Sequence, residues 1–349
     1  MKFNKEIFIG DKVISTSSAT FVIAEAGVNH GGDMAVAKKL IDLASESGAD
    51  AVKFQTFSAD DLILDNVEKA PYQKKTTAVS ESQMDMLRKL EVTKEQNVEL
   101  KSYSQEKGII FLTTPFDENS LEQIDSLDLL AYKVASTDTT NLPFLKKIAK
   151  KGKPIFLSTG MTYLSEIELA LRTIYKFNQN VVLLQCTANY PIRDEEANLK
   201  VIDTFKENFD VLVGYSDHSV GVGAAPFAIP MGAKVVEKHF TLDKSLEGPD
   251  HEASLSPEEL KDFVSLVRRV DSYMGTAVKT PNLSETRTRA SLQKCLVAAC
   301  DIKQGDLFTE ENIVAKRTGG IGISPIYSID ILGQIATRDF NTNDIIEII

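Results

Sequence analysis

Short apolar runs alternate with amphipathic segments through the first three quarters of the chain. Segments with helical spacing, such as residues 35–49, 141–152 and 165–177, lie between the runs. Runs rich in Val, Ile, Leu and Phe are typical of strands that are buried on both faces of a parallel sheet. There are eight: FVIAEA (21–26), AVKFQT (51–56), IIFLTTP (109–115), AYKVAS (131–136), PIFLST (154–159), VVLLQCT (181–187), VLVGYSD (211–217) and KVVEKH (234–239).

Strands that alternate with helices predict an α/β fold with a parallel sheet. Eight such units over about 250 residues match the size of a (β/α)8 TIM barrel. A doubly wound open sheet is the alternative, but the first turn reads AGVNHGGD and lacks the GxGxxG pattern expected there. The segment 256–275 begins with a capping box, Ser256 with Glu259, and is expected to be the last barrel helix.

The pattern changes after residue 275. Residues 276–293 are polar and weakly periodic, which is typical of a linker, and residues 294–349 carry short strand-like runs and turns. Within this tail, AACDIKQGDLFTEE (298–311) is similar to ATRDFNTNDIIEI (336–348), which indicates a small β-rich module with two related halves. We therefore expect a barrel domain over 1–275, with 1–18 as an N-terminal extension. The tail module is too small to bury much core alone, so we expect it to pack on a barrel, its own or a partner's.

The charge balance excludes several classes of function. The net charge is -11 and the pI about 5.0, which disfavours binding to nucleic acid or to an anionic membrane surface. No stretch approaches the roughly 18 apolar residues that a membrane span needs. The cysteines, Cys186, Cys295 and Cys300, form no close CxxC pair, so we expect a reducing, cytoplasmic location rather than a disulfide framework.

Polar side chains gather where the predicted strands end, which is where a barrel carries its active site. His218 and His239 end strands 7 and 8, which are neighbours about 5 Å apart in a barrel. Two imidazoles at that spacing can chelate one transition metal; the alternative is a pair of satisfied core histidines. Strand ends also carry Glu25, Lys53, Gln55, Thr114, Lys133, Ser136, Asp138, Ser158, Tyr190 and Ser216.

The lysines at the strand ends allow two kinds of chemistry. One is a cradle for a small, highly charged anion, in which Lys53 and Lys133 act with neighbouring hydroxyl groups. The other is a Schiff-base lysine, which needs a single desolvated amine apart from other cations. Lysines and hydroxyls on several strands favour the anion cradle. Lys238 alternates away from His239 and is expected to face the helix layer, outside the site.

A series of motifs follows the predicted barrel strands: IAEAGVNHGGD (23–33), VKFQTF (52–57), TTPFD (113–117), YKVAST (132–137), LSTGM (157–161), GYSDHS (214–219), EKHFTLD (237–243) and GPDHEAS (248–254). These motifs, in this order along the chain, resemble the sialic acid (N-acetylneuraminate) synthase family, which includes the legionaminic acid synthases. In the tail, CDIKQGD (300–306) and AKRTGGIG (315–322) resemble the antifreeze-like module of these enzymes, the SAF domain with its β-clip fold. The resemblance covers nearly the whole chain.

The resemblance implies roles for individual residues. His218 and His239 match metal ligands, for Mn²⁺ in first place and Mg²⁺ or Co²⁺ as alternatives. Glu25 and Asp250 match catalytic positions, and Asp138 stands where relatives often carry a catalytic glutamate. Gln55 and Arg317 match acceptor-sugar positions. The phosphoenolpyruvate pocket is matched by Lys53, Thr114, Lys133, Ser136, Ser158, Tyr190 and Ser216.

The resemblance also implies the reaction and the assembly. Phosphoenolpyruvate and water would condense with an N-acylated amino sugar, in a homodimer whose tail is swapped onto the other barrel. The acceptor would be N-acetylmannosamine, giving N-acetylneuraminate, or a 2,4-diacetamido-2,4,6-trideoxy-mannose, giving legionaminate. GPDH after strand 8 goes with sialic and legionaminic acid synthases, and KAPYQKKTT (69–77) is similar to legionaminic acid synthases.

Two other functions remain as alternatives. A synthase of phosphorylated ulosonates, of the heptulosonate or octulosonate phosphate type, would use the same donor but needs a second phosphate site. The sequence offers no further Arg/Lys cluster at a strand end for it. A sugar-binding or ice-binding protein led by the tail module would need neither the lysines nor the histidine pair at the strand ends.

Overall fold

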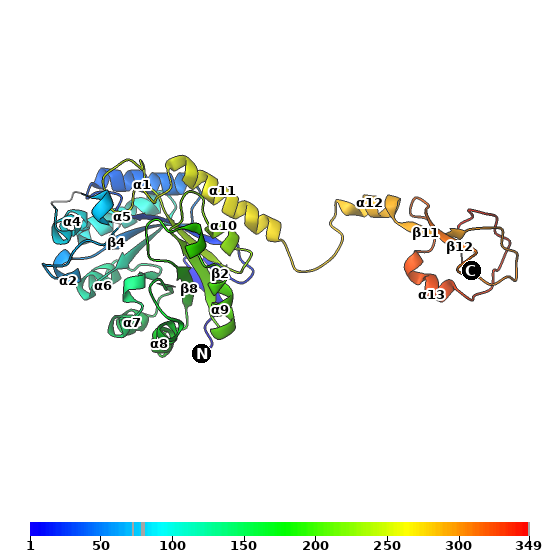
Figure 1. Cartoon of the computed structure of the whole chain (residues 1–349), viewed down its shortest axis with the longest axis horizontal. Helices are drawn as coiled ribbons and strands as arrows, with labels where there is room; N and C mark the ends of the chain where they lie inside the picture. Colours follow the sequence, from blue (N-terminus) through cyan, green and yellow to red (C-terminus); the bar gives the residue numbers. More distant parts are fainter. Residues whose placement is uncertain (72, 78–80, 348–349) are drawn as a thin grey trace. The chain divides into compact units, whose positions relative to one another are not determined.

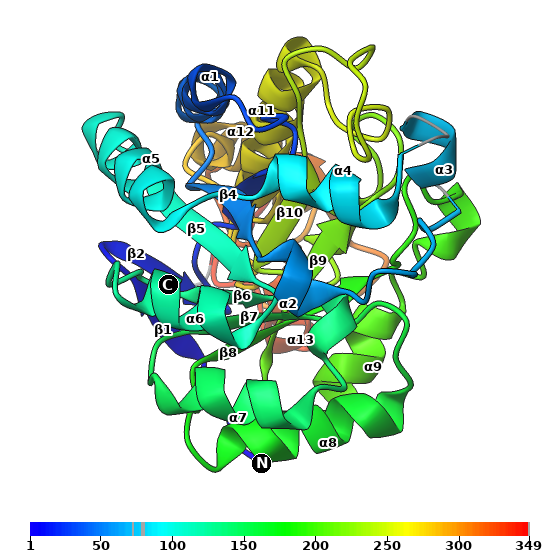
Figure 2. The same ribbon diagram turned by 90° about the vertical axis from the view of Figure 1, so that its left-hand side faces the viewer.

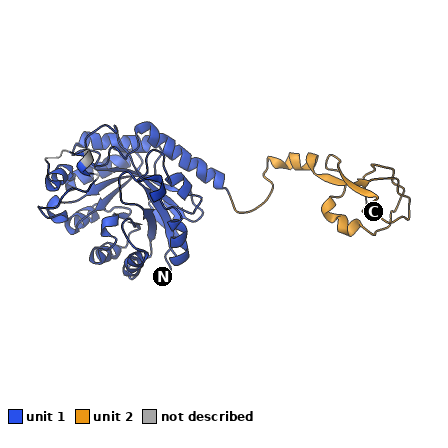
Figure 3. Cartoon of the chain, in the orientation of Figure 1, with its two compact units in different colours: residues 1–275 blue, residues 276–349 orange. Residues whose placement is uncertain are grey.

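The chain folds into two compact units, Met1–Gly275 and Thr276–Ile349, each described by itself (Figures 1 and 3). The computed structural model describes residues 1–71, 73–77 and 81–347. Residue 72, within the run 69–77, and the last two residues of the tail lie outside the described part. None of the described helices is both long enough and apolar enough to cross a membrane.

Unit 1 is an eight-stranded parallel barrel, which confirms the predicted fold class. The strand order is β5-β4-β3-β10-β9-β8-β7-β6, and the two end strands, β5 and β6, lie against one another. Every predicted apolar run forms one of these strands. The strands are β3 (Phe21–Gly27), β4 (Ala51–Thr56), β5 (Ile110–Pro115), β6 (Tyr132–Val134), β7 (Ile155–Ser158), β8 (Val181–Cys186), β9 (Leu212–Asp217) and β10 (Val235–His239).

Amphipathic helices cover the outside of the barrel. Their buried faces hold the expected apolar residues, such as Leu40, Ile41 and Ala44 of the first helix. The predicted capping box at Ser256 and Glu259 begins the last helix. The helices are α1 (Met34–Glu46), α5 (Lys94–Glu106), α6 (Glu118–Asp125), α7 (Leu142–Lys150), α8 (Leu164–Tyr175), α9 (Val201–Asn208), α10 (Ala225–Ala228) and α11 (Pro257–Met274). Two short 3-10 turns, Ser136–Asp138 and Asp194–Glu196, follow β6 and β8.

A long insertion between β4 and α5 lies at the carboxyl ends of the strands. It contains the short helices α2 (Ala59–Leu62), α3 (Gln73–Thr76) and α4 (Gln83–Leu90). Figure 2 shows these helices on the side of unit 1 that faces the viewer. Their apolar side chains form a small hydrophobic cluster with Val28 and Phe116, separate from the main core. The insertion is therefore packed by its own side chains and covers part of the carboxyl end of the barrel.

The N-terminal extension closes the opposite end of the barrel. Strands β1 (Glu6–Ile9) and β2 (Lys12–Ser15) form an antiparallel hairpin. Ile7, Ile9 and Ile14 are almost fully buried and pack with residues at the starts of the barrel strands, including Phe21 and Phe156. Apolar side chains thus seal the barrel interior at its amino end.

Unit 2, Thr276–Ile349, has an exposed helix before its first strand. Residues 276–293 were expected to be a linker, but they contain helix α12 (Glu285–Leu292), every residue of which is exposed. The helix has little apolar periodicity, so hydrophobic patterning could not reveal it. Strands β11 (Lys294–Ala298) and β12 (Ile313–Arg317) follow, then a 3-10 turn (Pro325–Tyr327) and α13 (Ser328–Ile331).

The predicted duplication in the tail is a structural repeat with an offset of 38 residues. Ile302 and Phe340 are equivalent positions, and each donates its backbone N–H to the other's carbonyl at 2.8 Å. Likewise Gly305 donates to Ala336 and Asn343 donates to Ala298, at 2.9 and 2.8 Å. These reciprocal bonds mean that the two halves pair around a local twofold and bury one shared core, which includes Phe308 and Phe340.

Candidate active site

The carboxyl ends of the barrel strands surround a cavity of about 670 Å³. The structure brings most of the predicted site residues together at its wall, although they come from all eight barrel strands or the loops after them. The lining includes Glu25, Lys53, Gln55, Thr114, Lys133, Ser136, Ser158, Tyr190, Ser216, His218, His239 and Asp250.

A buried network of alternating charges forms the floor of this cavity. Lys53 Nζ lies 2.5 Å from Glu25 Oε2 and donates to Thr114 Oγ1 at 3.1 Å. Lys133 Nζ pairs with Glu237 Oε1 at 2.9 Å, and Glu237 Oε2 is 3.8 Å from Lys53. All four charged residues are almost fully buried. The network therefore holds two ammonium groups, each with a carboxylate partner, at a depth where unpaired charge is costly.

The acidic groups of the site differ in their readiness to hold a proton. Burial raises the pKa of Glu25 to about 7, against the opposing effect of Lys53. Burial likewise raises the pKa of Asp250 to about 6. For Glu237 burial also acts upward, but Lys133 and Lys53 outweigh it and bring the pKa down to about 2. Glu25 and Asp250 can thus exchange protons near neutral pH, while Glu237 stays ionised.

A local irregularity in β3 shapes the site around Glu25. The pairing register between β3 and β4 shifts between Glu25 and Gly27, and Gly27 has φ +54. A Cβ at Gly27 would lie 3.3 Å from both Glu25 Oε1 and His239 Cε1. Gln55 Nε2 donates to Glu25 Oε1 at 3.3 Å. The absence of a side chain at Gly27 therefore lets Glu25, Gln55 and His239 approach one another.

His218 and His239 lie together, as the sequence predicted. Their ring centroids are 5.6 Å apart, and Tyr190 lies against both rings, at 4.0 and 5.5 Å. His218 Nδ1 is 2.7 Å from the carbonyl oxygen of Thr187, a contact that requires a proton on Nδ1, so that Nε2 is the electron-pair donor of the neutral ring. His239 Nδ1 has no hydrogen-bond partner among the described residues and lies 3.8 Å from Asp250 Oδ2.

These two histidines suit a divalent metal as a partial ligand set. Burial holds the pKa of His239 well below its usual value, so its imidazole is neutral and can donate an electron pair. The described residues contain no group of three or more His, Cys, Asp or Glu side chains arranged around one point. Water and substrate oxygens would therefore have to complete the coordination shell, as in open catalytic sites.

Three residues singled out in the sequence are not among those that line the cavity. Asp138 is not among the described lining residues: its side chain turns back in the 3-10 turn, where it accepts from Asn141 Nδ2 at 3.1 Å and Thr137 Oγ1 at 3.2 Å. Asp138 therefore supports the turn that presents Ser136, and the geometry does not favour a catalytic role. Arg317 ends β12 in unit 2 and is exposed. Lys238 pairs with Asp217 at 3.1 Å and lies outside the cavity lining, as expected.

Sequence reasoning missed two features of the cavity. Glu237, two positions before His239 and on the same strand face, was not included although its carboxylate joins both lysines. The period-2 alternation was the signal that could have identified it. The apolar side chains of the insertion after β4 were also missed, because nothing in that segment predicts that it folds over the strand ends.

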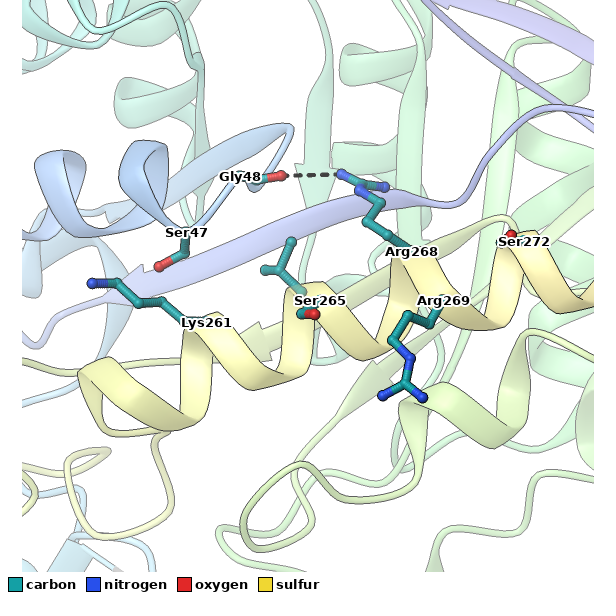
Figure 4. Close-up of a pocket in the computed structure, with 8 residues that line it drawn as sticks. Ser47, Gly48, Lys261, Ser265, Arg268, Arg269 and Ser272 are labelled. Carbon is teal, nitrogen blue, oxygen red and sulfur yellow. Dashed lines mark hydrogen bonds between the residues drawn. The ribbon is translucent and has the colours of Figure 1, made fainter.

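A second, shallower depression lies on the outer surface between α1 and α11 (Figure 4). Arg268 dominates it and donates to the Gly48 carbonyl at 3.2 Å and to Asp50 Oδ2 at 2.7 Å. Its guanidinium thus ties α11 to the barrel. None of the predicted site residues is among those that line this depression: Ser47, Gly48, Lys261, Val264, Ser265, Arg268, Arg269 and Ser272.

Comparison with known proteins identifies relatives that match nearly the whole chain. The chain is 47% identical over 330 residues to an N,N'-diacetyllegionaminic acid synthase of Campylobacter jejuni, covering 94% of this chain and 98% of that protein. It is 42% identical to the protein of the same name from Legionella pneumophila, covering 93% and 92%. A solved N-acetylneuraminic acid (sialic acid) synthetase from Leptospira borgpetersenii has a TM-score of 0.74 and 34% identity, covering 83% of this chain and 98% of that one.

Two family models match successive parts of the chain. The SAF domain model matches residues 293–347, which hold both halves of the tail repeat. The NeuB family model matches residues 40–279, which hold the cavity residues from β4 to β10. The chain therefore belongs to the NeuB family and carries a SAF domain after its barrel.

Proposed function

We propose that this protein condenses phosphoenolpyruvate with 2,4-diacetamido-2,4,6-trideoxy-mannose and water, giving N,N'-diacetyllegionaminate and phosphate. N-acetylmannosamine, giving N-acetylneuraminate, is the alternative acceptor. The observation that carries the proposal is that two buried lysines and a histidine pair face one cavity. The N,N'-diacetyllegionaminic acid synthases at 47% and 42% identity support the first acceptor.

The lysines and hydroxyls are suited to hold the donor. Phosphoenolpyruvate carries a carboxylate and a phosphate, and Lys53 and Lys133 would pair with them as charge-assisted donors. Ser158 Oγ lines the cavity and has no partner among the described residues. It is therefore free to donate to an anion. Because the ammonium groups are already fixed by Glu25 and Glu237, they need little reorganisation as charge develops on the departing phosphate.

The carboxylates are suited to proton transfer. The C3 carbon of phosphoenolpyruvate attacks the aldehyde carbon of the sugar, water adds at C2, and phosphate leaves with cleavage of its C–O bond. Glu25, whose pKa is about 7, is our candidate to take a proton from that water. Asp250, with a pKa of about 6 and close to His239, is the candidate to exchange a proton on the acceptor side.

His218 and His239 would hold a divalent metal, for which we propose Mn²⁺, with Mg²⁺ or Co²⁺ as substitutes. When bound, the metal would polarise the aldehyde of the acceptor as a Lewis acid. Tyr190 packs against both imidazoles and keeps their rings in place. The Thr187 carbonyl fixes the tautomer of His218, which is the usual task of such an outer partner.

The cavity disfavours a phosphorylated acceptor. Apart from Lys53 and Lys133, no lysine or arginine is among its described lining residues. A second phosphate would bring two more negative charges to a wall that offers them no partner. This argues against the heptulosonate or octulosonate phosphate type of synthase.

For the assembly we propose a homodimer in which the SAF domain of one chain covers the barrel mouth of the other and Arg317 contacts the acyl group of the acceptor in trans. Its planar, permanently charged donor group suits an amide carbonyl. We also propose a cytoplasmic location, which is supported by the free thiols of Cys186, Cys295 and Cys300.

Phosphate release from phosphoenolpyruvate with Mn²⁺ tests the proposal, with the two sugars supplied in parallel. We expect rapid release with the diacetamido sugar. His239→Ala should lose Mn²⁺-dependent turnover and Mn²⁺ affinity while its circular dichroism spectrum is unchanged. If folded, Mn²⁺-loaded protein releases no phosphate with either sugar, the synthase proposal is wrong and a sugar- or ice-binding role gains support.

A further inference from the structure

The cavity has two chemically different sides. The strand ends supply charged and hydroxyl groups, whereas the insertion after β4 supplies an apolar wall. The wall belongs to the insertion's own hydrophobic cluster, so its side chains are held in place by packing. Its members that line the cavity are Phe57, Leu62, Ile63, Met86, Leu87 and Leu90.

The two sides suit different substrates. A donor with a carboxylate and a phosphate needs the lysines and hydroxyls of the strand ends, so it leaves the apolar wall to the acceptor. A sugar with hydroxyls at every position would lose water contacts there without gaining hydrogen bonds. A sugar that carries methyl groups in place of hydroxyls would instead bury apolar surface against these side chains.

One polar atom in this wall has no partner. Gln83 lines the cavity from the first turn of α4, where Ser82 caps the helix by accepting from the Asp85 N–H. Gln83 Oε1 is buried and has no hydrogen-bond partner among the described residues. The other glutamine of the insertion that lines the cavity, Gln73, differs, because its Oε1 accepts from the Ala70 N–H at 2.9 Å. A buried acceptor without a partner is uncommon in proteins.

We propose that Gln83 is a specificity residue, whose Oε1 accepts a hydrogen bond from the N–H of the second acylamino group on the acceptor sugar, which N-acetylmannosamine lacks, while the apolar wall covers methyl groups of the acceptor. An acylamino group offers a donor and a methyl group together, which is the combination that an acceptor atom set among apolar side chains can satisfy. This inference rests on the proposed function and deepens it: the same site prefers a diacetamido-deoxy sugar to N-acetylmannosamine.

The test is steady-state kinetics of the full-length, Mn²⁺-loaded enzyme with both sugars. Gln83→Met keeps the length of the side chain and removes its acceptor oxygen. We expect kcat/KM for the diacetamido sugar to fall about tenfold or more, mainly through KM, since a site that hydrogen-bonds a substrate group discriminates strongly by it. KM for phosphoenolpyruvate should stay the same, and the loss with N-acetylmannosamine should be smaller.

Two further variants sharpen the result. Ile63→Thr puts a hydroxyl into the wall at a partly exposed position and should shift the ratio of kcat/KM toward N-acetylmannosamine. Gln105→Met makes the same chemical change at an exposed position near the end of α5. It should leave kcat/KM unchanged for both sugars.

The outcomes separate this inference from the proposed function. Wild-type turnover combined with equal losses for both sugars in Gln83→Met, or with a raised KM for phosphoenolpyruvate, would overturn the role of Gln83 and leave the synthase intact. A wild-type preference for N-acetylmannosamine would also overturn it. Absence of turnover with both sugars would instead remove the proposed function itself.

Discussion

At the scale of single residues, the arrangement of Glu237 between Lys53 and Lys133 is the most consequential feature of the site. A buried ammonium group without a counter-charge is strongly destabilising. The carboxylate of Glu237 supplies the counter-charge for Lys133, whose Nζ lies 2.9 Å from Glu237 Oε1. It also supplies part of the counter-charge for Lys53, whose Nζ lies 3.8 Å from Glu237 Oε2. An incoming dianion competes for the same lysines, so Glu237 acts as a built-in substitute for the donor's negative charge when the site is empty.

Glu237→Gln should therefore make folding depend on the donor. We expect the variant to lose about 2 kcal/mol of stability, because Lys133 keeps a hydrogen-bonding partner but loses its counter-charge. Phosphoenolpyruvate should then raise the melting temperature of the variant more than that of the wild type, in differential scanning fluorimetry. Glu252→Gln, at an exposed position, is the matched control and should behave as wild type. Equal shifts in all three proteins would contradict this account.

His30 gives a residue-scale prediction outside the site. It is 3% exposed, and burial lowers its pKa to about 4, because the charged form would be desolvated. His30 takes up a proton at higher pH in the unfolded chain than in the folded chain. Its contribution to the free energy of unfolding is therefore full above pH 6.5 and decreases as the pH falls toward 4. Between pH 7.5 and 5 the loss should be about 2 kcal/mol.

Urea unfolding of His30→Asn, followed across this pH range, checks the prediction. Asparagine can still accept from the Gly32 N–H, as His30 Nδ1 does at 3.0 Å, but it does not titrate. The difference in unfolding free energy between wild type and variant should shrink as pH falls, because only the wild type loses this contribution. A difference that is independent of pH would mean that His30 is protonated, or accessible, in the folded protein.

Most of the predicted site residues line one cavity, because strand ends converge in a barrel and polar residues at those ends could be grouped without coordinates. Sequence reasoning failed where the local backbone sets the direction in which a side chain points. Asp138 follows β6 closely, yet a 3-10 turn rotates its side chain onto Asn141. Gln83 lies far from any strand end, and only the folding of the insertion brings it to the cavity.

At the scale of elements, the eight strands and the main helices followed from apolar periodicity, because each buries a continuous face. The N-terminal hairpin and α12 did not. The hairpin strands have four residues each, too few for a clear pattern, and α12 buries nothing. The hairpin nevertheless matters for stability, because Ile7, Ile9 and Ile14 fill the amino end of the barrel.

Ile14→Ala should destabilise unit 1 by about 3 kcal/mol, since it leaves a cavity among side chains that cannot collapse into it. Its neighbour Val13 is 36% exposed, so Val13→Ala should cost less than about 1 kcal/mol. Guanidinium unfolding measures both. Turnover at 25 °C should be unchanged in both variants, because the hairpin and the cavity lie at opposite ends of the barrel. A similar loss of unfolding free energy for the two substitutions would show that Ile14 is not tightly packed at the amino end of the barrel.

At the scale of the whole molecule, the proposed swapped dimer makes each active site a composite of two chains. His239 would come from one chain and Arg317 from the other, so inactivating changes at these positions should complement each other. His239→Ala and Arg317→Ala homodimers should each lose most activity with the sugar acceptor. After denaturation together and refolding, half of the dimers should be mixed, and each mixed dimer would hold one complete site and one doubly damaged site.

The refolded mixture should therefore recover about a quarter of wild-type activity, as random assortment into closed dimers requires. Phosphate release on the refolded mixture is the measurement, and each variant refolded alone under the same conditions is the control. If Arg317 served the barrel of its own chain, the mixed dimer would contain no complete site, and the mixture would be no more active than the mean of the two homodimers. Recovery of activity thus distinguishes a site in trans from a site in cis without a structure of the complex.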